Sequence, residues 1–76
     1  MLSFDLIKKI LREKYQVTSD IDLDTNLVDE LGFDSIIFME LAMEIKKEIK
    51  LKREIPQELI NSWNTTKSIT DSIARL

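Results

Sequence analysis

Apolar residues recur every three or four positions near the start of the chain, with charged residues between them. The apolar positions of this stretch are Leu6, Ile7, Ile10 and Leu11. A period of about 3.6 residues is typical of an amphipathic helix with one buried face. Ser3 is a residue type that favours helix N-termini, and the β-branched pair Val17-Thr18 disfavours continuation of a helix. The pattern predicts a first helix over residues 3–15.

Residues 17–34 break this pattern, because acidic residues but no basic ones occur there and the apolar positions are scattered. These apolar positions include Ile21, Leu23, Leu27, Val28 and Leu31. Connections longer than about 12–15 residues are uncommon and are usually functional. We predict a long structured loop whose leucines enter the core.

The spacing of three aspartates in this segment raises the question of a calcium site. Asp20, Asp22 and Asp24 match the first, third and fifth positions of an EF-hand loop. The match then fails, since Thr25 stands at the glycine position and Leu31 at the position of the bidentate glutamate. The sequence therefore predicts a solvated acidic loop and no metal site.

A second helical pattern follows Asp34, a residue type that caps helices, and extends from Ser35 to about Lys50. At about 100° per residue, one arc of this helix is expected to face the core. That arc contains Phe38, Leu41, Ala42, Ile45 and Ile49. A separate arc contains Ile36, Met39 and Met43, with Glu40 and Lys47 beside it. A surface helix needs only the first arc, so the second is either additional core, which the pattern alone favours, or an exposed docking surface.

The remainder of the chain predicts two further helices. Pro56 is suited to the first turn of a short third helix, which continues through residues 58–60 and is covered by Trp63. Thr65 or Thr66 begins a last helix. Its expected buried residues are Ile69, Ile73 and Leu76. The predicted fold is all-α: one domain over residues 1–76, a four-helix bundle with a short third helix and a long loop between helices one and two.

The composition changes what this fold can do. The 76 residues are 43% hydrophobic and 33% charged, and histidine and cysteine are absent. Without them the chain lacks imidazole bases, thiolate nucleophiles and the usual zinc ligands. A single glycine and a single proline also leave little material for a phosphate-binding glycine loop. We predict no catalytic residue and no metal site, so the function is expected to lie in what binds to the chain or is attached to it.

The net charge of −3 is unevenly distributed. A basic cluster follows the second helix pattern and contains Lys46, Lys47, Lys50, Lys52 and Arg53. Nucleic-acid-binding domains are usually basic throughout, so one cluster on an acidic chain is interpreted first as a solvated helix end. No apolar run approaches the roughly 18 residues of a membrane span, and Asp5, Lys8 and Lys9 interrupt any signal-peptide core. We expect a cytoplasmic chain that binds no nucleic acid and does not insert into membranes.

Ser35 is the candidate for chemistry. Gly32, the only glycine, precedes the predicted helix start, where an adjustable backbone is useful. A serine in the first helical turn exposes its hydroxyl beside backbone N–H groups and the positive end of the helix dipole, where a phosphate ester is electrostatically favoured. From the residues alone, the simpler interpretation, a polar residue at a helix start, is favoured.

The same residues also form a longer motif. The segment Gly32-Phe33-Asp34-Ser35-Ile36, followed by Glu40-Leu41, resembles the G-x-D-S-[LI]…E-L signature of acyl carrier proteins. The resemblance extends over the whole chain. Residues 25–32 correspond to the end of the family's long loop, residues 54–56 to the segment before its third helix, and Thr65-Thr66 to the cap of its last helix.

The resemblance implies a carrier protein without catalytic activity of its own. In the family, the serine that matches Ser35 bears a covalent 4′-phosphopantetheine arm, derived from coenzyme A, which holds an acyl group as a thioester. Asp34 would cap the helix and help a phosphopantetheinyl transferase to dock with a metal and coenzyme A. The family's partner-docking surface corresponds here to Ile36, Met39, Glu40, Met43 and Lys47. The implied partners are this transferase and the acyl-loading and acyl-processing enzymes, and we expect a monomer.

Two departures from the family pattern bear on the pathway. Ile37 stands where an acidic residue is common, and Lys46 and Lys47 follow on a helix that is typically acidic. The link between the second and third helices is also longer than usual. Both features indicate a specialised lipid, polyketide or peptide pathway rather than ordinary fatty-acid synthesis, whose enzymes present basic surfaces to their carriers. The alternatives are an aminoacyl or peptidyl carrier, although Phe33-Asp34 favours the acyl type, and an unmodified helical protein-interaction module.

Overall fold

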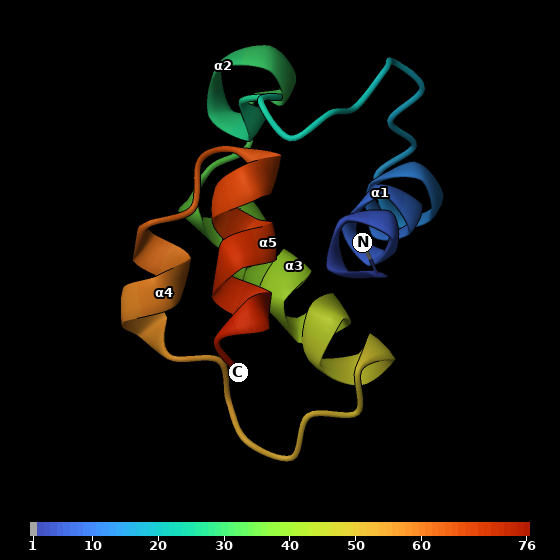
Figure 1. Cartoon of the computed structure of the whole chain (residues 1–76). Helices are drawn as coiled ribbons and strands as arrows, with labels where there is room; N and C mark the ends of the chain where they lie inside the picture. The colour runs from blue at the N-terminus through green and yellow to red at the C-terminus, as the bar shows by residue number, and fades with distance from the viewer. Residues whose placement is uncertain (1) are drawn as a thin grey trace.

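The computed structural model describes residues 2–76, with side chains from Ser3 onward. Within that range the chain forms five helices: α1 (Leu2–Lys14), α2 (Leu27–Leu31), α3 (Ser35–Glu48), α4 (Gln57–Asn61) and α5 (Thr66–Ala74). The structure is therefore all-α over the described residues, as the sequence predicts. It contains one short helix more than the predicted four, because α2 lies within the segment that was expected to be a loop (Figure 1).

Helix α1 lies one residue earlier than predicted. It begins at Leu2, so Ser3 is inside the helix and the prediction of Ser3 as the N-cap is wrong. At the other end, Gln16 adopts a left-handed backbone conformation with φ of 53°, and the Val17 amide donates to the Leu11 carbonyl at 3.1 Å. A left-handed residue after the last turn, closed by such a bond, is a common helix terminator. The helix thus ends through the conformation of Gln16 as well as the low helix propensity that follows it.

Helix α2 is closed at both ends by side-chain and backbone caps. The Asn26 side chain accepts hydrogen bonds from the amides of Val28, at 3.0 Å, and Asp29, at 2.9 Å. The Glu30 carboxylate accepts from the Asn26 amide at 2.7 Å. Gly32 ends the helix in the left-handed region, with φ of 71° and its amide bonded to the Val28 carbonyl at 3.1 Å. These reciprocal caps account for a helix in a stretch of only five residues, which propensity alone would not support.

The geometry of α2 also decides which apolar side chains of this segment are buried. Leu27 is fully buried and Leu31 is half-buried, because residues four apart lie on the same helical face. Val28 falls on another face and is 43% exposed, and Leu23 is 42% exposed. The expectation that the leucines of this segment enter the core is therefore wrong for Leu23, whereas Leu27 is buried and Leu31 half-buried.

The segment before α2 is held against the start of α5 by backbone hydrogen bonds. The Leu27 amide donates to the Asn64 carbonyl at 2.7 Å, and the Thr66 amide donates to the Thr25 carbonyl at 3.0 Å. An isolated antiparallel bridge pairs Asn26 with Thr65 at the same place. Parts of the chain far apart in sequence are thereby fixed side by side, which explains how a long connection remains ordered.

The core is formed where α1, α3 and α5 meet. Helix α1 packs against both α3 and α5, and α4 packs against α3 (Figure 1). The fully buried apolar side chains are Ile7, Leu11, Leu27, Leu41, Ile45 and Ile69. An aromatic row crosses this core, with ring centroids 5.3 Å apart for Tyr15–Phe33, 5.6 Å for Phe33–Phe38 and 6.3 Å for Phe38–Trp63. Phe38 thus connects the α3 face of the core to the segment between α4 and α5.

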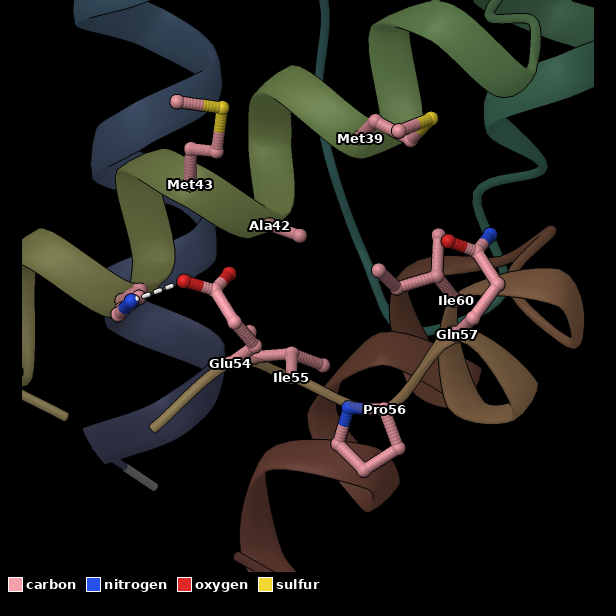
Figure 2. Close-up of a pocket in the computed structure, with 9 residues that line it drawn as sticks. Met39, Ala42, Met43, Glu54, Ile55, Pro56, Gln57 and Ile60 are labelled. Atoms are coloured by element: carbon pink, nitrogen blue, oxygen red, sulfur yellow. Dashed lines mark hydrogen bonds and ion pairs between the residues drawn. The ribbon is translucent and has the colours of Figure 1, made fainter. Parts of the chain in front are cut away.

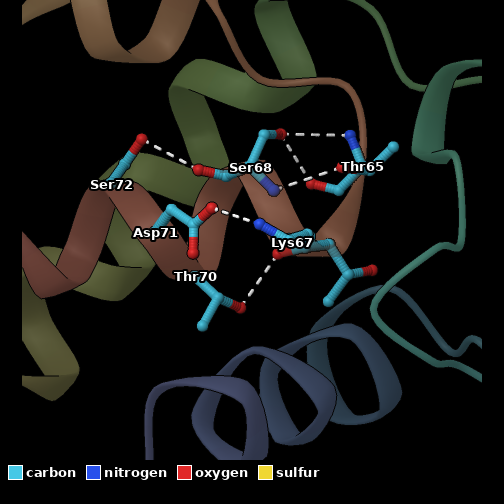
Figure 3. Close-up of polar contacts among 7 residues, drawn as sticks. Thr65, Lys67, Ser68, Thr70, Asp71 and Ser72 are labelled. Carbon is cyan, nitrogen blue, oxygen red and sulfur yellow. Dashed lines mark hydrogen bonds and ion pairs between the residues drawn. The ribbon is translucent and has the colours of Figure 1, made fainter.

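Helix α5 begins with a capping box (Figure 3). The Thr65 hydroxyl accepts from the Ser68 amide at 3.1 Å, and the Ser68 hydroxyl accepts from the Thr65 amide at 3.1 Å. Thr65 is therefore the cap, one of the two threonines predicted for this role, and Thr66 is buried inside the first turn. At α4, Pro56 occupies the N-cap position rather than the first turn. None of the helices in residues 2–76 is long and apolar enough to cross a membrane.

Candidate prosthetic-group site and docking face

The site around Ser35 is built by the sharp change of direction between α2 and α3. Gly32 ends α2, and Asp34 then adopts an extended conformation with φ of −122° and ψ of −177°. The Asp34 carboxylate accepts a hydrogen bond from the Ile37 amide at 2.9 Å, so Asp34 is the N-cap of α3. Ser35 is the first residue of the helix, and its side chain is exposed.

The turn at position 32 requires a left-handed backbone conformation, and this explains why the only glycine stands there. A Cβ atom added there would meet no heavy atom within 4 Å. The requirement is therefore conformational and not a matter of space, since φ is 71°. The glycine leaves only two residues, Gly32 and Phe33, between the end of α2 and the cap of α3.

The Ser35 hydroxyl lies where a phosphate ester is electrostatically favoured. It stands at the positive end of the dipole of α3, in which the peptide dipoles of 14 residues are aligned. The chain contains no histidine to deprotonate the hydroxyl. Among the described residues, no group of three or more acidic, histidine or cysteine side chains is arranged to hold a metal ion. Ser35 is thus an exposed hydroxyl at a helix N-terminus, where another protein can reach it.

An open hollow of about 420 Å³ lies directly beside Ser35. Its lining residues are Val28, Phe33, Asp34, Ser35, Phe38, Gln57, Ile60, Asn61 and Trp63. The wall combines buried aromatic rings with the polar ends of Gln57 and Asn61, which fits an arm that carries both amide and methylene groups. Val28, Gln57 and Asn61 were not predicted as site residues from the sequence. For Val28, the spacing of Leu27 and Leu31 is a signal that places it off the buried face.

The second arc of α3 is exposed. Ile36 is 67% exposed, Met39 49% and Met43 65%, whereas Phe38, Leu41, Ala42 and Ile45 are buried. The interpretation of this arc as additional core, which the pattern alone favoured, is therefore wrong. Ile49, expected on the buried arc, is 37% exposed because it follows the last turn of α3 as its C-cap. Ile36, Met39, Met43 and the exposed Lys47 form a continuous stripe, which we call the α3 stripe.

Glu40 lies at the edge of this stripe that faces α1. A hollow there is lined by Lys14, Tyr15, Glu40, Met43 and Glu44. Burial raises the pKa of the Tyr15 phenol above its usual value, and the negative charges of Glu40 and Glu44 raise it further. The acidic residues in the first three turns of α3 are thus near Tyr15 rather than at the centre of the stripe.

On the opposite edge, the stripe borders a groove of about 440 Å³ between α3 and α4 (Figure 2). Met39, Ala42 and Met43 form one wall, and residues 54–57 with Ile60 form the other. Lys46 forms an ion pair with Glu54 at one end of the groove, which connects α3 to the segment before α4. Lys46 is therefore already paired within the chain, whereas Lys47 takes part in none of the ion pairs found within residues 3–76.

Comparison with known proteins accounts for this combination of helical fold, exposed serine and adjoining helix face. The family model described as phosphopantetheine attachment site matches residues 5–73. The chain is also 32% identical over 71 residues to a protein named acyl carrier protein from Clostridium perfringens, covering 92% of this chain and 91% of that protein. It is equally 32% identical, over 74 residues, to acyl carrier protein AcpXL from Mesorhizobium japonicum, covering 91% of this chain and 74% of that protein.

These similarities define a class of carrier that bears a covalently attached prosthetic group. The chain belongs to the acyl carrier protein family, whose members carry 4′-phosphopantetheine and are carriers rather than enzymes. The resemblance seen in the sequence is thereby confirmed over nearly the whole chain. Members of the family interact with phosphopantetheinyl transferases and with acyl-handling enzymes in general.

Proposed function

We propose that Ser35 is the attachment residue and that the chain delivers acyl groups, held as thioesters on its arm, to partner enzymes of a specialised lipid or polyketide-type pathway. The observation that carries the proposal is the exposed Ser35 hydroxyl at the first turn of α3, inside the segment matched by the family model. The adjoining hollow supports it, because an arm leaving Ser35 would meet its apolar and polar wall at once.

In the proposed attachment step, the chain supplies the hydroxyl of Ser35. Ser35 Oγ attacks the phosphorus of coenzyme A that bears the pantetheine part. The bond from this phosphorus to the adenosine 3′,5′-bisphosphate oxygen breaks, and that bisphosphate leaves. The serine proton passes to a base on the transferase, because the chain supplies no histidine. Asp34 holds the first turn of α3 in place for this step by capping the Ile37 amide, and we propose that it also contributes to transferase docking.

We also propose that the carrier serves a specialised pathway and not ordinary fatty-acid synthesis. The chain is 32% identical both to a protein named acyl carrier protein and to one named acyl carrier protein AcpXL, so the percentage identity alone does not separate the two. Ile37 and the basic end of α3 depart from the pattern of carriers that serve ordinary fatty-acid synthesis. The proposal includes a monomeric chain that acts as one carrier domain over residues 1–76 in the cytoplasm, with the α3 stripe and Glu40 as its docking surface.

Incubation with coenzyme A and a promiscuous phosphopantetheinyl transferase tests the attachment. Intact-mass measurement should show addition of one phosphopantetheine to the wild-type chain and none to Ser35→Ala. Ser62→Ala is the matched control, since Ser62 is also exposed but lies after α4, and this variant should be modified like the wild type. An unmodified wild-type chain would favour the alternative of a pure interaction module, and modification of Ser35→Ala would place the arm elsewhere.

The cargo class is tested with the loaded protein. Holo-chain offered acyl-coenzyme A-dependent loading enzymes should accept acyl groups, whereas an adenylating enzyme that activates amino acids should load it poorly. Efficient aminoacyl loading with little acyl loading would favour the aminoacyl or peptidyl carrier alternative.

A further inference from the structure

The α3 stripe ends in a lysine, and a second lysine lies just beyond the C-terminal end of the helix. Lys47 lies one turn after Met43 on the same face, and Lys50 follows just beyond the helix end. Both side chains are exposed. The docking face is therefore apolar near Ser35 and positively charged at its far end.

The acidic residues of α3 do not balance this charge, because they are near α1. Glu48 pairs with Lys9 of α1, with 3.8 Å between the charged atoms. Glu40 and Glu44 line the hollow that also contains Lys14 and Tyr15. The raised pKa of Tyr15 agrees with this placement, since both carboxylates contribute to it. What the far end of the stripe presents to a partner is thus mainly Lys47 and Lys50.

A hollow of about 450 Å³ lies at this end of the molecule. Its lining residues are Met43, Lys46, Lys47, Lys50, Leu51 and Glu54. The carboxylate of Glu54 is paired with Lys46, whereas the ion pairs found within residues 3–76 include neither Lys47 nor Lys50. The hollow therefore combines the apolar side chains of Met43 and Leu51 with two lysines available to a binding partner.

We propose that this end of α3 docks an acidic protein surface. The enzyme that receives the carrier places carboxylates against Lys47 and Lys50 and an apolar side chain against Met43 and Leu51. The inference rests on the proposed function, because it takes α3 as the docking helix. Lysines near a helix C-terminus also interact favourably with the helix dipole. That role needs only positive charge in the last turn and does not require an apolar hollow between the lysines.

A charge exchange between carrier and enzyme tests this proposal. The first probe is a carrier-dependent condensing enzyme whose carrier-binding rim is basic. The second is a variant of the same enzyme, in which the two rim residues that face the end of α3 are changed to glutamate. Wild-type carrier and Lys47→Glu/Lys50→Glu are loaded with the same acyl group. Opposed charges speed association and like charges suppress it, so kcat/KM at low salt should rise roughly tenfold when the carrier is reversed against the basic rim. It should fall by a similar factor against the glutamate rim, and both differences should shrink at high salt.

The matched control carries the same change in net charge on another helix. Lys67→Glu/Arg75→Glu alters two exposed residues, one in α5 and one at its C-cap, outside the α3 stripe. Its kcat/KM should stay near that of the wild type with both enzymes. Lys47→Gln/Lys50→Gln should give intermediate rates, and circular dichroism should show native helix content in every variant. Equal rates for all carriers, or equal effects of the control, would overturn the proposal by showing that position does not matter.

Further outcomes distinguish the docking proposal from the carrier function and from binding to a lipid surface. If the variants gain phosphopantetheine but no rate depends on Lys47 and Lys50, the docking proposal fails while the carrier function stands. If none gains phosphopantetheine, the carrier function itself fails. Binding of the wild-type chain to phosphatidylserine–phosphatidylcholine vesicles at physiological salt, lost in Lys47→Glu/Lys50→Glu, would assign these lysines to an anionic lipid surface and overturn the acidic-protein partner.

Discussion

The indole N–H of Trp63 donates a hydrogen bond of 2.9 Å to the hydroxyl of Ser72, and both side chains are buried. This contact joins the segment after α4 to α5. The Ser72 hydroxyl in turn donates to the Ser68 carbonyl at 2.9 Å within α5. The position of Trp63, which lines the hollow beside Ser35, therefore depends on a buried polar contact with α5.

Ser72→Ala should destabilise the fold, because it leaves the buried Trp63 N–H without its partner. The expected loss in the free energy of unfolding is about 1–3 kcal/mol, measured by urea denaturation followed by circular dichroism. Ser62→Ala is the control, since Ser62 is exposed and its hydroxyl donates to the Leu59 carbonyl of its own turn. Trp63→Phe/Ser72→Ala should lose less than the sum of the single changes, because it removes both polar partners. An additive double variant would show that the two side chains are not coupled.

Leu41→Ala should leave the chain partly unfolded at room temperature. Leu41 is fully buried, and truncation of such a residue costs about 2–5 kcal/mol. A core of this size rarely supplies more than about 3–5 kcal/mol in total. Phe38→Ala and Ile45→Ala are expected to behave alike. Met39→Ala on the exposed face of α3 is the control and should keep its helical circular dichroism signal. A native thermal midpoint for Leu41→Ala would contradict the burial described for this face.

Gly32→Ala should cost about 1–2 kcal/mol through backbone strain alone, because the left-handed conformation disfavours a Cβ atom and no neighbouring atom obstructs it. Gly32→Asn should cost less, since asparagine tolerates this conformation. The measurement is the difference in unfolding free energy among the three chains. Equal stability of Gly32→Ala and wild type would mean that the turn between α2 and α3 adjusts without loss.

Tyr15 should make stability fall at alkaline pH. Its pKa is raised in the folded chain by burial first and by Glu40 and Glu44 second, so the neutral phenol is favoured by folding. This contribution is fully present below the unfolded pKa of about 10 and is lost as the pH rises from there through the higher folded pKa. Tyr15→Phe should lose less stability over this window. Tyr15 is the only tyrosine, so absorbance of its phenolate reports the pKa directly.

Glu40→Gln/Glu44→Gln provides the control for this titration. The native pKa of Tyr15 should decrease but remain above that of the urea-unfolded chain, since burial persists. A native pKa at or below the unfolded one would contradict the packing described around Tyr15.

The sequence predicted the long helices well, because their apolar periodicity extends over several turns. The buried arc through Phe38, Leu41 and Ile45 is where the pattern placed it. The sequence did not predict α2, since five residues show little periodicity and the helix depends on caps by Asn26 and Gly32. Periodicity likewise could not show which apolar residues are exposed.

The sequence predicted only part of the site, because the rest depends on contacts between residues that are far apart in the chain. Motif and helix start indicated Ser35 and Asp34, which are neighbours in sequence. The hollow beside them requires α4 to pack against α3, and this brings in Gln57 and Trp63 from more than twenty residues away. The pairing of Lys46 with Glu54 also crosses the α3–α4 connection, so no local pattern indicates that Lys46 is less available than Lys47.

The aromatic wall beside Ser35 has a practical consequence. Trp63 is the chain's only tryptophan, and its buried side chain forms part of the wall of the hollow beside Ser35. The emission of that ring is sensitive to what replaces water around it. With the arm attached at Ser35 as proposed, an arm folded back against this wall should change the Trp63 emission relative to an arm extended toward an enzyme, so the unlabelled chain would contain its own optical probe.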